Sequence, residues 1–191
     1  MGLSAGLDFT GDWLALREPF DHVARAPVVT AATVAHLRAH AAPRVADLGC
    51  GRGSGLRFLR PRVGAGVRWR LVDRDPDLLE QAARALDPGD AVDLVTADLR
   101  GDDLADLVAG ADLVSAAALI DLVDDAWLAG LVGAVEAAGA ALVVTGSVDG
   151  RVQWEPVHPA DGDMAAAYAR HQAGDKGFGA ALGTAAPARL A

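Results

Sequence analysis

The fold is decided by the stretch Arg44-Val45-Ala46-Asp47-Leu48-Gly49-Cys50-Gly51-Arg52-Gly53-Ser54-Gly55, in which an apolar strand leads into four glycines at alternate positions and a helix start. Glycines let the backbone turn sharply, so that its N–H groups and the positive end of the next helix come close to an anionic or polar ligand. The spacing does not fit the dinucleotide pattern G-x-G-x-x-G/A, because its third place falls on Ser54 or on Leu56. The stretch therefore predicts a ligand-binding loop with a different glycine spacing.

The pattern that does fit is acid-x-G-x-G-x-G, from Asp47 to Gly53. It resembles motif I of the class I S-adenosylmethionine-dependent methyltransferases, and the resemblance extends over the central part of the chain. It implies that S-adenosylmethionine is the cofactor and that it is bound by five residues of the loop: Asp47, Gly49, Cys50, Gly51 and Gly53. Cys50 would be a small filler in this loop rather than a nucleophile.

A second predicted strand, residues 67–73, ends in Asp73, 24 positions after Gly49. An acid about 20 residues beyond such a loop can accept hydrogen bonds from the hydroxyls of a ribose. We therefore expect Asp73 to bind the cofactor, together with its neighbour Arg74.

Two further strands match the family in the same order along the chain. Residues 92–97 precede Asp98 and Leu99, and the resemblance implies that Asp98 lies beside the adenine amine, with Leu99 in the same site. Residues 111–117 resemble the fourth strand, on which Ser115 is another candidate for cofactor binding. The loop that follows is rich in alanine where the family more often has Asn, His or Glu, so it says little about the substrate.

Helical patterns alternate with these strands. Asp75-Pro76-Asp77 supplies an N-cap, a proline and a first-turn acid for one helix, and a second helix spans 124–138, before a fifth strand at 140–145. An alanine-rich helix at 28–40 precedes the first strand, and we expect His36 and His40 on its surface. This alternation predicts an α/β fold, a doubly wound, mostly parallel Rossmann-like sheet with helices on both faces.

The segment after the fifth strand departs from the family, for which the resemblance implies the strand order 3-2-1-4-5-7-6 with a final antiparallel hairpin. Residues 146–155 predict a hairpin around Asp149-Gly150, with 151–155 pairing antiparallel to 141–145. The alternatives are an absent seventh strand or a shortened chain. In each case we expect C-terminal strands that are shortened or atypical.

Length and composition predict one domain, because 191 residues with 52% hydrophobic side chains suffice for a single sizeable core. We divide it into cap helices (1–42), a cofactor-binding core (43–147) and an atypical C-terminal segment (148–191). Charged residues interrupt every apolar run that could span a bilayer, the N-terminus lacks a basic leader, and a single cysteine excludes an internal disulfide. These features predict a cytoplasmic protein with no membrane partner and no metal site, and they leave a homodimer open.

The net charge of −9 and the pI near 4.8 argue against a nucleic-acid partner, since such proteins gather Lys and Arg on one basic face. The basic residues between 57 and 70 fit a solvated helix and strand edge instead. We therefore expect a small-molecule substrate.

Two flanks outside the shared core supply candidate substrate-binding residues, Arg17 and Lys176. The resemblance implies a mobile cap over the substrate at residues 13–25, and the same stretch also fits an ordinary amphipathic helix. Residues 161–179 contain the only lysine, Lys176, after a stripe at helical spacing that is more typical of packing than of chemistry. The stripe consists of Met164, Ala167, Tyr168 and His171.

Three residues are candidates for a catalytic base: Asp121, just beyond the fourth strand, and the flank histidines His22 and His171. The function that the resemblance implies is methyl transfer from S-adenosylmethionine to a small molecule, with a base needed only if the acceptor must lose a proton. One alternative is an NAD(P)-dependent oxidoreductase, which the glycine spacing and the lack of a Tyr-x-x-x-Lys pair disfavour. Another is a methyltransferase-like protein that binds the cofactor without turnover.

Overall fold

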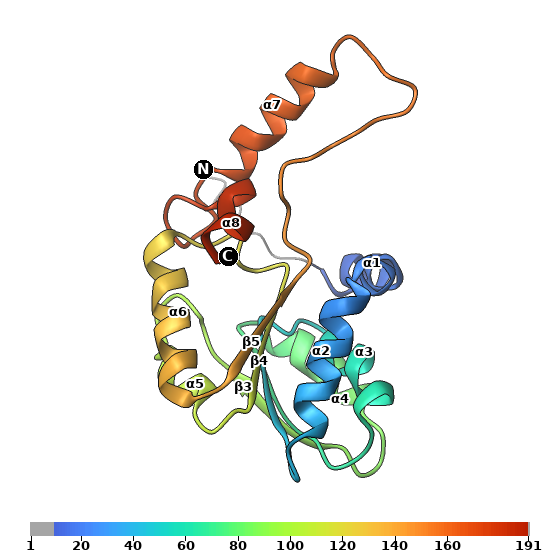
Figure 1. Ribbon diagram of the computed structural model, residues 1–191, viewed down its shortest axis with the longest axis vertical. Coiled ribbons are helices and arrows are strands. Elements are labelled where there is room, and N and C mark those ends of the chain that lie inside the picture. The colour runs from blue at the N-terminus through green and yellow to red at the C-terminus, as the bar shows by residue number, and fades with distance from the viewer. Residues whose placement is uncertain (1–9, 191) are drawn as a thin grey trace.

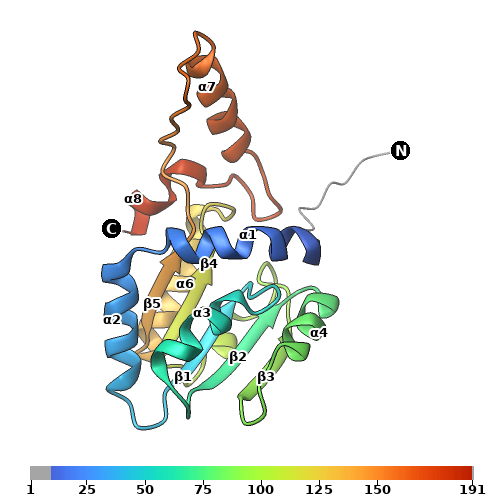
Figure 2. The ribbon, with the colours of Figure 1, turned by 90° about the vertical axis from the view of Figure 1, so that its right-hand side faces the viewer.

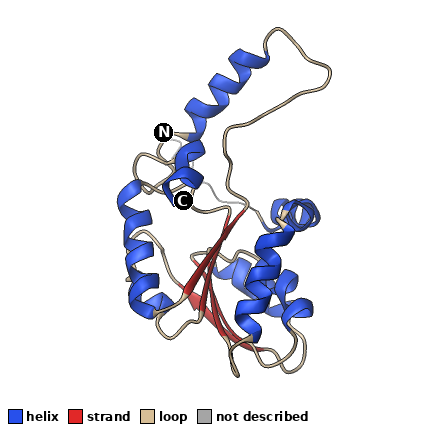
Figure 3. Ribbon diagram, viewed as in Figure 1, coloured by secondary structure: helices blue, strands red, loops and turns tan. Residues whose placement is uncertain are grey.

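The structure, a computed structural model, describes residues 10–190 and contains one sheet of five parallel strands. The strands, red in Figure 3, are β1 (Arg44–Leu48), β2 (Arg68–Asp73), β3 (Ala91–Thr96), β4 (Leu113–Ala117) and β5 (Ala141–Thr145). Their order is β3-β2-β1-β4-β5, and every neighbouring pair is parallel. This confirms the predicted parallel sheet and the 3-2-1-4-5 part of the family order.

Helices cover both faces of this sheet, as the sequence predicts. α2, α3 and α4 lie on one face, α5 and α6 lie on the other, and α1 runs across the carboxyl ends of the strands (Figures 1 and 2). The helices are α1 (Gly11–Ala24), α2 (Pro27–Arg38), α3 (Ser54–Val63), α4 (Pro76–Arg84), α5 (Leu104–Val108), α6 (Asp125–Ala138), α7 (Asp161–Gln172), the 3-10 helix η1 (Gly183–Ala185) and α8 (Ala186–Leu190). The sequence predicts no basic leader at the N-terminus. This expectation concerns residues 1–9, which lie outside the described residues.

Local signals in the sequence set the helix ends. The Asp75 carboxylate accepts a hydrogen bond from the Asp77 N–H at 2.9 Å, and the Asp124 carboxylate accepts one from the Trp127 N–H at 2.8 Å. Both are N-caps, which satisfy backbone donors that a helix start leaves free. Gly139 ends α6 in the left-handed conformation, as a C-cap glycine does.

Alternating strand residues divide the core into two apolar layers. Leu48, Val72 and Val114 belong to the layer beneath α5 and α6, whereas Val45 and Leu71 belong to the layer beneath α2, α3 and α4. The three central strands β1, β2 and β4 are buried on both faces, as strands of parallel sheets usually are. No helix within residues 10–190 combines the length and the apolar character that crossing a bilayer requires.

The expected surface positions of His36 and His40 are only partly confirmed, because both residues are half-buried. His36 is half-buried, and its Nε2 lies 2.9 Å from the Asp112 carbonyl oxygen. It therefore ties α2 to the start of β4 and takes no part in a surface patch.

The hairpin expected around Asp149-Gly150 is absent, because residues 151–155 form no strand. A strand here would place Arg151, Gln153 and Glu155 on one face, whereas both faces beside β5 belong to apolar layers. The chain instead extends away from the sheet into α7 and returns at η1 (Figure 1). We call residues 147–182 the arm.

The expectation that α7 packs through its apolar stripe is also wrong. α7 has no buried residue, and Met164 and Tyr168 are 59% and 38% exposed. After the arm the chain rejoins the core, where the Leu182 N–H donates to the Val123 carbonyl at 2.8 Å. The arm is thus attached to the core at its base.

Candidate functional site

The glycine loop between β1 and α3 has the geometry that its sequence predicts. Gly49, Gly51 and Gly53 all have positive φ angles, 65°, 53° and 77°, which residues with a side chain rarely adopt. A Cβ atom on Gly51 would also lie 3.1 Å from Leu14 of α1. Glycine at position 51 is therefore required twice, by the turn and by the close approach of α1.

Asp73, at the end of β2, is held against this loop. Its Oδ2 accepts a hydrogen bond from the Gly51 N–H at 2.7 Å, and its Oδ1 accepts one from the Asp75 N–H at 3.0 Å. Burial raises the pKa of Asp73, and the two backbone hydrogen bonds oppose the shift. The carboxylate is thus fixed at the carboxyl edge of the sheet, where open parallel sheets bind ligands.

A first cavity of about 170 Å³ opens beside Asp73. Its apolar lining includes Leu78, Ala97, Leu119 and Phe178. Seven of the residues that the sequence singles out line it as well: Gly49, Gly51, Asp73, Arg74, Asp98, Leu99 and Lys176. The end of β2, the loops that follow β1 and β3, and the arm therefore converge on one concave site.

In the lining of the first cavity Asp98 forms an ion pair with Arg100. The hydrogen bonds and charge of Arg100 lower the pKa of Asp98 to about 2, so that the carboxylate is ionised at neutral pH. Lys176 reaches the same cavity, and its Nζ donates to the His171 carbonyl at 2.9 Å. Phe178 closes the wall with its ring edge against Trp127.

A second cavity of about 90 Å³ shares Leu14, Gly49, Gly51 and Ala118 with the first. The two cavities therefore meet at the glycine loop beneath α1. Like the first cavity, the second is lined by both charged and apolar residues. Its remaining lining residues are Arg17, Glu18, Asp21, Arg25, Cys50, Arg52, Ser54, Ala117, Thr145 and Gly146.

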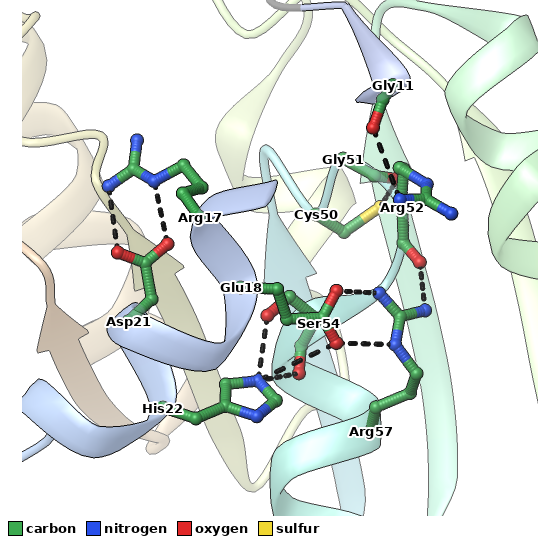
Figure 4. Close-up of polar contacts among 10 residues, drawn as sticks. All are labelled: Gly11, Arg17, Glu18, Asp21, His22, Cys50, Gly51, Arg52, Ser54 and Arg57. Carbon is green, nitrogen blue, oxygen red and sulfur yellow. Dashed lines mark hydrogen bonds and ion pairs between the residues drawn. The ribbon is translucent and has the colours of Figure 1, made fainter. Parts of the chain in front are cut away.

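α1 is bonded to the glycine loop and to α3 (Figure 4). The Arg57 guanidinium donates to both carboxylate oxygens of Glu18, at 2.7 and 2.5 Å, and His22 Nε2 lies 2.9 Å from the Ser54 hydroxyl. Burial opposes ionisation of Glu18, but the hydrogen bond and charge of Arg57 hold the pKa of Glu18 below its usual value. Arg52 adds a hydrogen bond to the Gly11 carbonyl at 3.2 Å. α1 therefore covers the site as a docked helix.

Arginines in the second cavity differ in their partners. Arg17 donates to both carboxylate oxygens of Asp21, at 2.7 and 3.1 Å. The Arg25 guanidinium instead lies over the Phe58 ring, 4.4 Å from its centre, and Arg62 lies over the same ring. The predicted substrate residue Arg17 thus lines the cavity with its charge already paired.

Three predicted cofactor residues, Asp47, Gly53 and Ser115, lie beneath the site and do not line either cavity. Burial raises the pKa of Asp47 to about 6, although a hydrogen bond with Ser115 and the charge of Arg25 lower it. A Cβ on Gly55 would lie 2.5 Å from the Asp47 carboxylate. The fourth glycine of the motif therefore makes room for Asp47, a role that the sequence alone does not reveal.

None of the three candidate bases lines either cavity. His22 is hydrogen-bonded to Ser54, and burial lowers its pKa although Glu18 and the Ser54 carbonyl favour the charged form. His171 is exposed on the arm. Asp121 is buried with its Oδ1 unpartnered among the described residues, and burial raises its pKa.

Sequence reasoning missed several residues of the site. Leu14 lines both cavities, and only its place in a charged and aromatic flank could have indicated it. Ala118 lines both cavities with a φ of 51°, the one positive φ at a non-glycine residue within residues 10–190. Phe178 reaches the site only because the arm returns to the loop after β4. In the described part of the chain, His, Cys, Asp and Glu form no group that could hold a metal ion.

Comparison with known proteins places the fold. No protein-family model and no curated protein matches the sequence. Among solved structures, an O-methyltransferase family protein from Burkholderia thailandensis aligns over 91% of this chain and 49% of its own, with a TM-score of 0.59 at 20% identity. The apo form of the S-adenosylmethionine-dependent methyltransferase SibL aligns over 82% of this chain and 42% of its own, with a TM-score of 0.51 at 20% identity.

A third structure, a possible exported protein from Bordetella parapertussis, aligns over 72% of this chain and 44% of its own, with a TM-score of 0.50 at 28% identity. The chain thus spans about half the length, or less, of these three proteins. At these identities the alignments establish architecture, and the chain has the fold of the S-adenosylmethionine-dependent methyltransferases.

Proposed function

We propose that this chain binds S-adenosylmethionine with its adenosine in the first cavity, and that it transfers the methyl group to a small molecule bound toward the second. The observation that carries the proposal is the Asp73 carboxylate, which lines the first cavity while it holds the glycine loop through Gly51. A carboxylate oxygen has two lone pairs, so each oxygen of Asp73 can accept one more hydrogen bond, from a ribose hydroxyl.

The other residues of the first cavity suit an adenosine. Leu78, Ala97 and Leu119 offer apolar surface to a flat ring, as small-molecule pockets do. Asp98 stays ionised through Arg100 and can accept a hydrogen bond from the adenine amine. At Gly51 the backbone is free to approach the ligand closely.

When bound, S-adenosylmethionine supplies a methyl group on a sulfonium, and the task of the protein is to align the acceptor with it and keep water away. α1 would exclude water, because it covers the point where the two cavities meet. The second cavity would hold the acceptor, between Arg17 on α1 and Thr145 at the end of β5. The charge of −9 supports a small-molecule acceptor over a nucleic acid.

We assign no catalytic base, because Asp121, His22 and His171 all lie off both cavities. Positioning alone can supply a large part of a rate enhancement in a bimolecular transfer. An acceptor that enters in its ionised form needs no base at all.

Calorimetric titration tests the cofactor. S-adenosylmethionine and S-adenosylhomocysteine should both bind with one site per chain, and NAD⁺ and NADP⁺ should not bind. Gly51→Val should abolish binding of the first pair, since its side chain would press on Leu14 where the two cavities meet and would strain the turn. Binding of a nicotinamide cofactor in place of S-adenosylmethionine would overturn the proposal and favour an oxidoreductase.

Turnover needs its own experiment. The protein is incubated with S-adenosylmethionine and a panel of phenols, amines and carboxylic acids, and S-adenosylhomocysteine and the methylated product are measured by mass spectrometry. We expect both to appear with at least one acceptor class. Tight binding with no product from any acceptor would favour a cofactor-binding protein without activity.

A further inference from the structure

β5 is an edge strand whose outer side is left unprotected. Within residues 10–190 it pairs with β4 alone. Its sequence, Ala141 to Thr145, contains no charged residue and no proline, the features by which proteins usually prevent edge strands from pairing further. The opposite edge strand, β3, carries Asp93 in an ion pair with Arg70. The two edges of the sheet are therefore built differently.

The hydrogen bonds to β4 show which backbone groups of β5 remain free. The Ala141 N–H donates to the Asp112 carbonyl at 3.0 Å, and the Thr145 carbonyl accepts from the Ala118 N–H at 2.8 Å. Backbone groups alternate in direction along a strand. The N–H and C=O groups of Leu142 and Val144 therefore point away from β4, toward the open edge.

We propose that two copies of this chain associate through antiparallel pairing of their β5 strands, about a two-fold axis at Val143. In this register Leu142 lies opposite Val144 of the partner subunit, and Val144 lies opposite Leu142 of the partner subunit. Each of these two pairs exchanges two hydrogen bonds, so every outward group of Leu142 and Val144 finds a partner. Between them Val143 faces Val143 of the partner subunit.

Other symmetric registers fit less well. An axis at Leu142 would pair Val144 with Ala140 of the partner subunit, but the Ala140 N–H already donates to the Val135 carbonyl. An axis at Val144 would pair Leu142 with Gly146 of the partner subunit, and Gly146 leaves the extended conformation with a φ of 72°. The register about Val143 alone uses both outward residues.

The layers on either side of β5 also favour a second copy. Leu142 and Val144 pack against the layer of α6, whereas Val143 packs against the layer of α2, so the register keeps each layer continuous across the axis.

A cysteine cross-link tests the register on the full chain. Val143 and Val143 of the partner subunit form a non-hydrogen-bonded antiparallel pair in this register. The Cα atoms of such a pair are about 4.5 Å apart, within the range that a disulfide spans. Val143→Cys should therefore give a covalent dimer on mild oxidation, seen by non-reducing electrophoresis and intact mass. Ala141→Cys is the matched control, because this register places it opposite Thr145 of the partner subunit, and it should form no covalent dimer. The wild type, whose Cys50 is buried, is the blank.

A second variant tests the hydrogen bonds. Val144→Pro removes an outward N–H and no bond to β4, a position that edge strands tolerate. It takes two of the four intermolecular bonds from the dimer, so the dissociation constant measured by sedimentation over a concentration series should rise about tenfold or more.

Three results would overturn the proposal: a wild type that stays monomeric throughout the series, a Val143→Cys variant that does not cross-link, or a Val144→Pro variant that dimerises as tightly as the wild type. None of these measurements involves cofactor or acceptor, so their failure would leave the proposed function intact.

Discussion

Asp73 joins the glycine loop to the start of α4, because its two oxygens accept backbone N–H groups from Gly51 and Asp75. The same carboxylate would bind the ribose of the cofactor. Asp73→Asn keeps the size of the side chain and removes its charge, so S-adenosylmethionine affinity should fall about ten- to a hundredfold, the value of one or two charge-assisted hydrogen bonds. Calorimetric titration measures the change.

The matched control for this variant is Asp93→Asn. Asp93 lies on β3 near the opposite end of the sheet and pairs with Arg70. Its loss should leave cofactor affinity unchanged. An Asp73→Asn variant that binds S-adenosylmethionine like the wild type would remove Asp73 from the site.

The raised pKa of Asp47 predicts how the free energy of unfolding depends on pH. Its carboxyl is buried beneath the glycine loop, and burial raises its pKa from 3.8 to about 6. Between about pH 4 and pH 6 the folded chain keeps this proton and the unfolded chain releases it, so the free energy of unfolding falls as pH rises through this window. The loss should reach about 3 kcal/mol and stay constant above it.

Urea denaturation of the wild type and of Asp47→Asn, at a series of pH values, isolates this effect. Asparagine cannot titrate, so the difference in unfolding free energy between the two proteins should shift in favour of the variant as pH rises from 4 to 6. Burial also raises the pKa values of Asp73 and Asp121. The contribution of Asp121 cancels between the two proteins, whereas the charge of Asp73 helps to raise the pKa of Asp47 and is part of the measured difference. A difference that does not depend on pH would show that Asp47 titrates normally.

A variant of Asp121 tests whether this residue is a catalytic base or is only close to the site in sequence. Its place just beyond β4 indicates a general base, and removing a general base typically costs about a hundredfold or more in kcat. The structure places Asp121 off both cavities, so we expect Asp121→Asn to lower kcat less than about tenfold, with cofactor affinity unchanged. A hundredfold fall in kcat at constant affinity would restore the base.

At the scale of elements, α1 owes its position to contacts that fold distant segments together. Glu18 and Arg57 are 39 residues apart in the chain, and both are half-buried. Loss of a partly buried, two-point ion pair should release the helix more readily. In Glu18→Gln, hydrogen exchange of the amides of residues 11–24 should accelerate about tenfold or more, while the strands keep their protection.

Glu80→Gln on α4 is the control, because it breaks an ion pair with Arg84 that is exposed and lies within one helix. Exposed pairs of this kind contribute little to stability, so exchange should stay at the wild-type rate in α1 and α4. Equal exchange in Glu18→Gln and the wild type would show that other contacts hold α1 in place.

Elements whose cause is local were predictable from the sequence. The apolar runs predicted the strands, Asp75 and Asp124 predicted two helix starts, and the glycine spacing predicted the loop. Elements that depend on distant partners were not. Nothing local shows that Glu18 will meet Arg57, or that the segment around Asp149 will leave the sheet.

The same distinction between local causes and distant partners explains which residues of the candidate site could be predicted. Asp73 and Asp98 follow strands directly, and strand ends of a parallel sheet meet at one edge, so their convergence could be foreseen. Asp121 and Ser115 occupy the same part of the chain but point elsewhere, because their orientation depends on the packing around β4. Their distance from the cavities could not be read from the sequence.

The molecule as a whole consists of a closed core and the arm, residues 147–182. Gly150, near the start of the arm, and Gln172, the last residue of α7, both lie at η1: a Cβ on Gly150 would lie 3.0 Å from Thr184, and one on Gly183 would lie 3.1 Å from Gln172. Between Gly150 and Gln172, α7 has twelve residues and buries none of them. An isolated helix of this length is marginal in water, so α7 adds little to the stability of the core.

Excision of the arm tests this division. Residues 152–168 are replaced by a linker of about six glycines, which is long enough because the ends of the arm are close together. The free energy of unfolding should change by less than about 1 kcal/mol, since no buried contact is lost, and S-adenosylmethionine should bind as before, because Lys176 and Phe178 are kept. A loss of several kcal/mol would show that the arm is part of the folding core. Turnover that falls while stability and cofactor affinity hold would instead assign the arm to the acceptor.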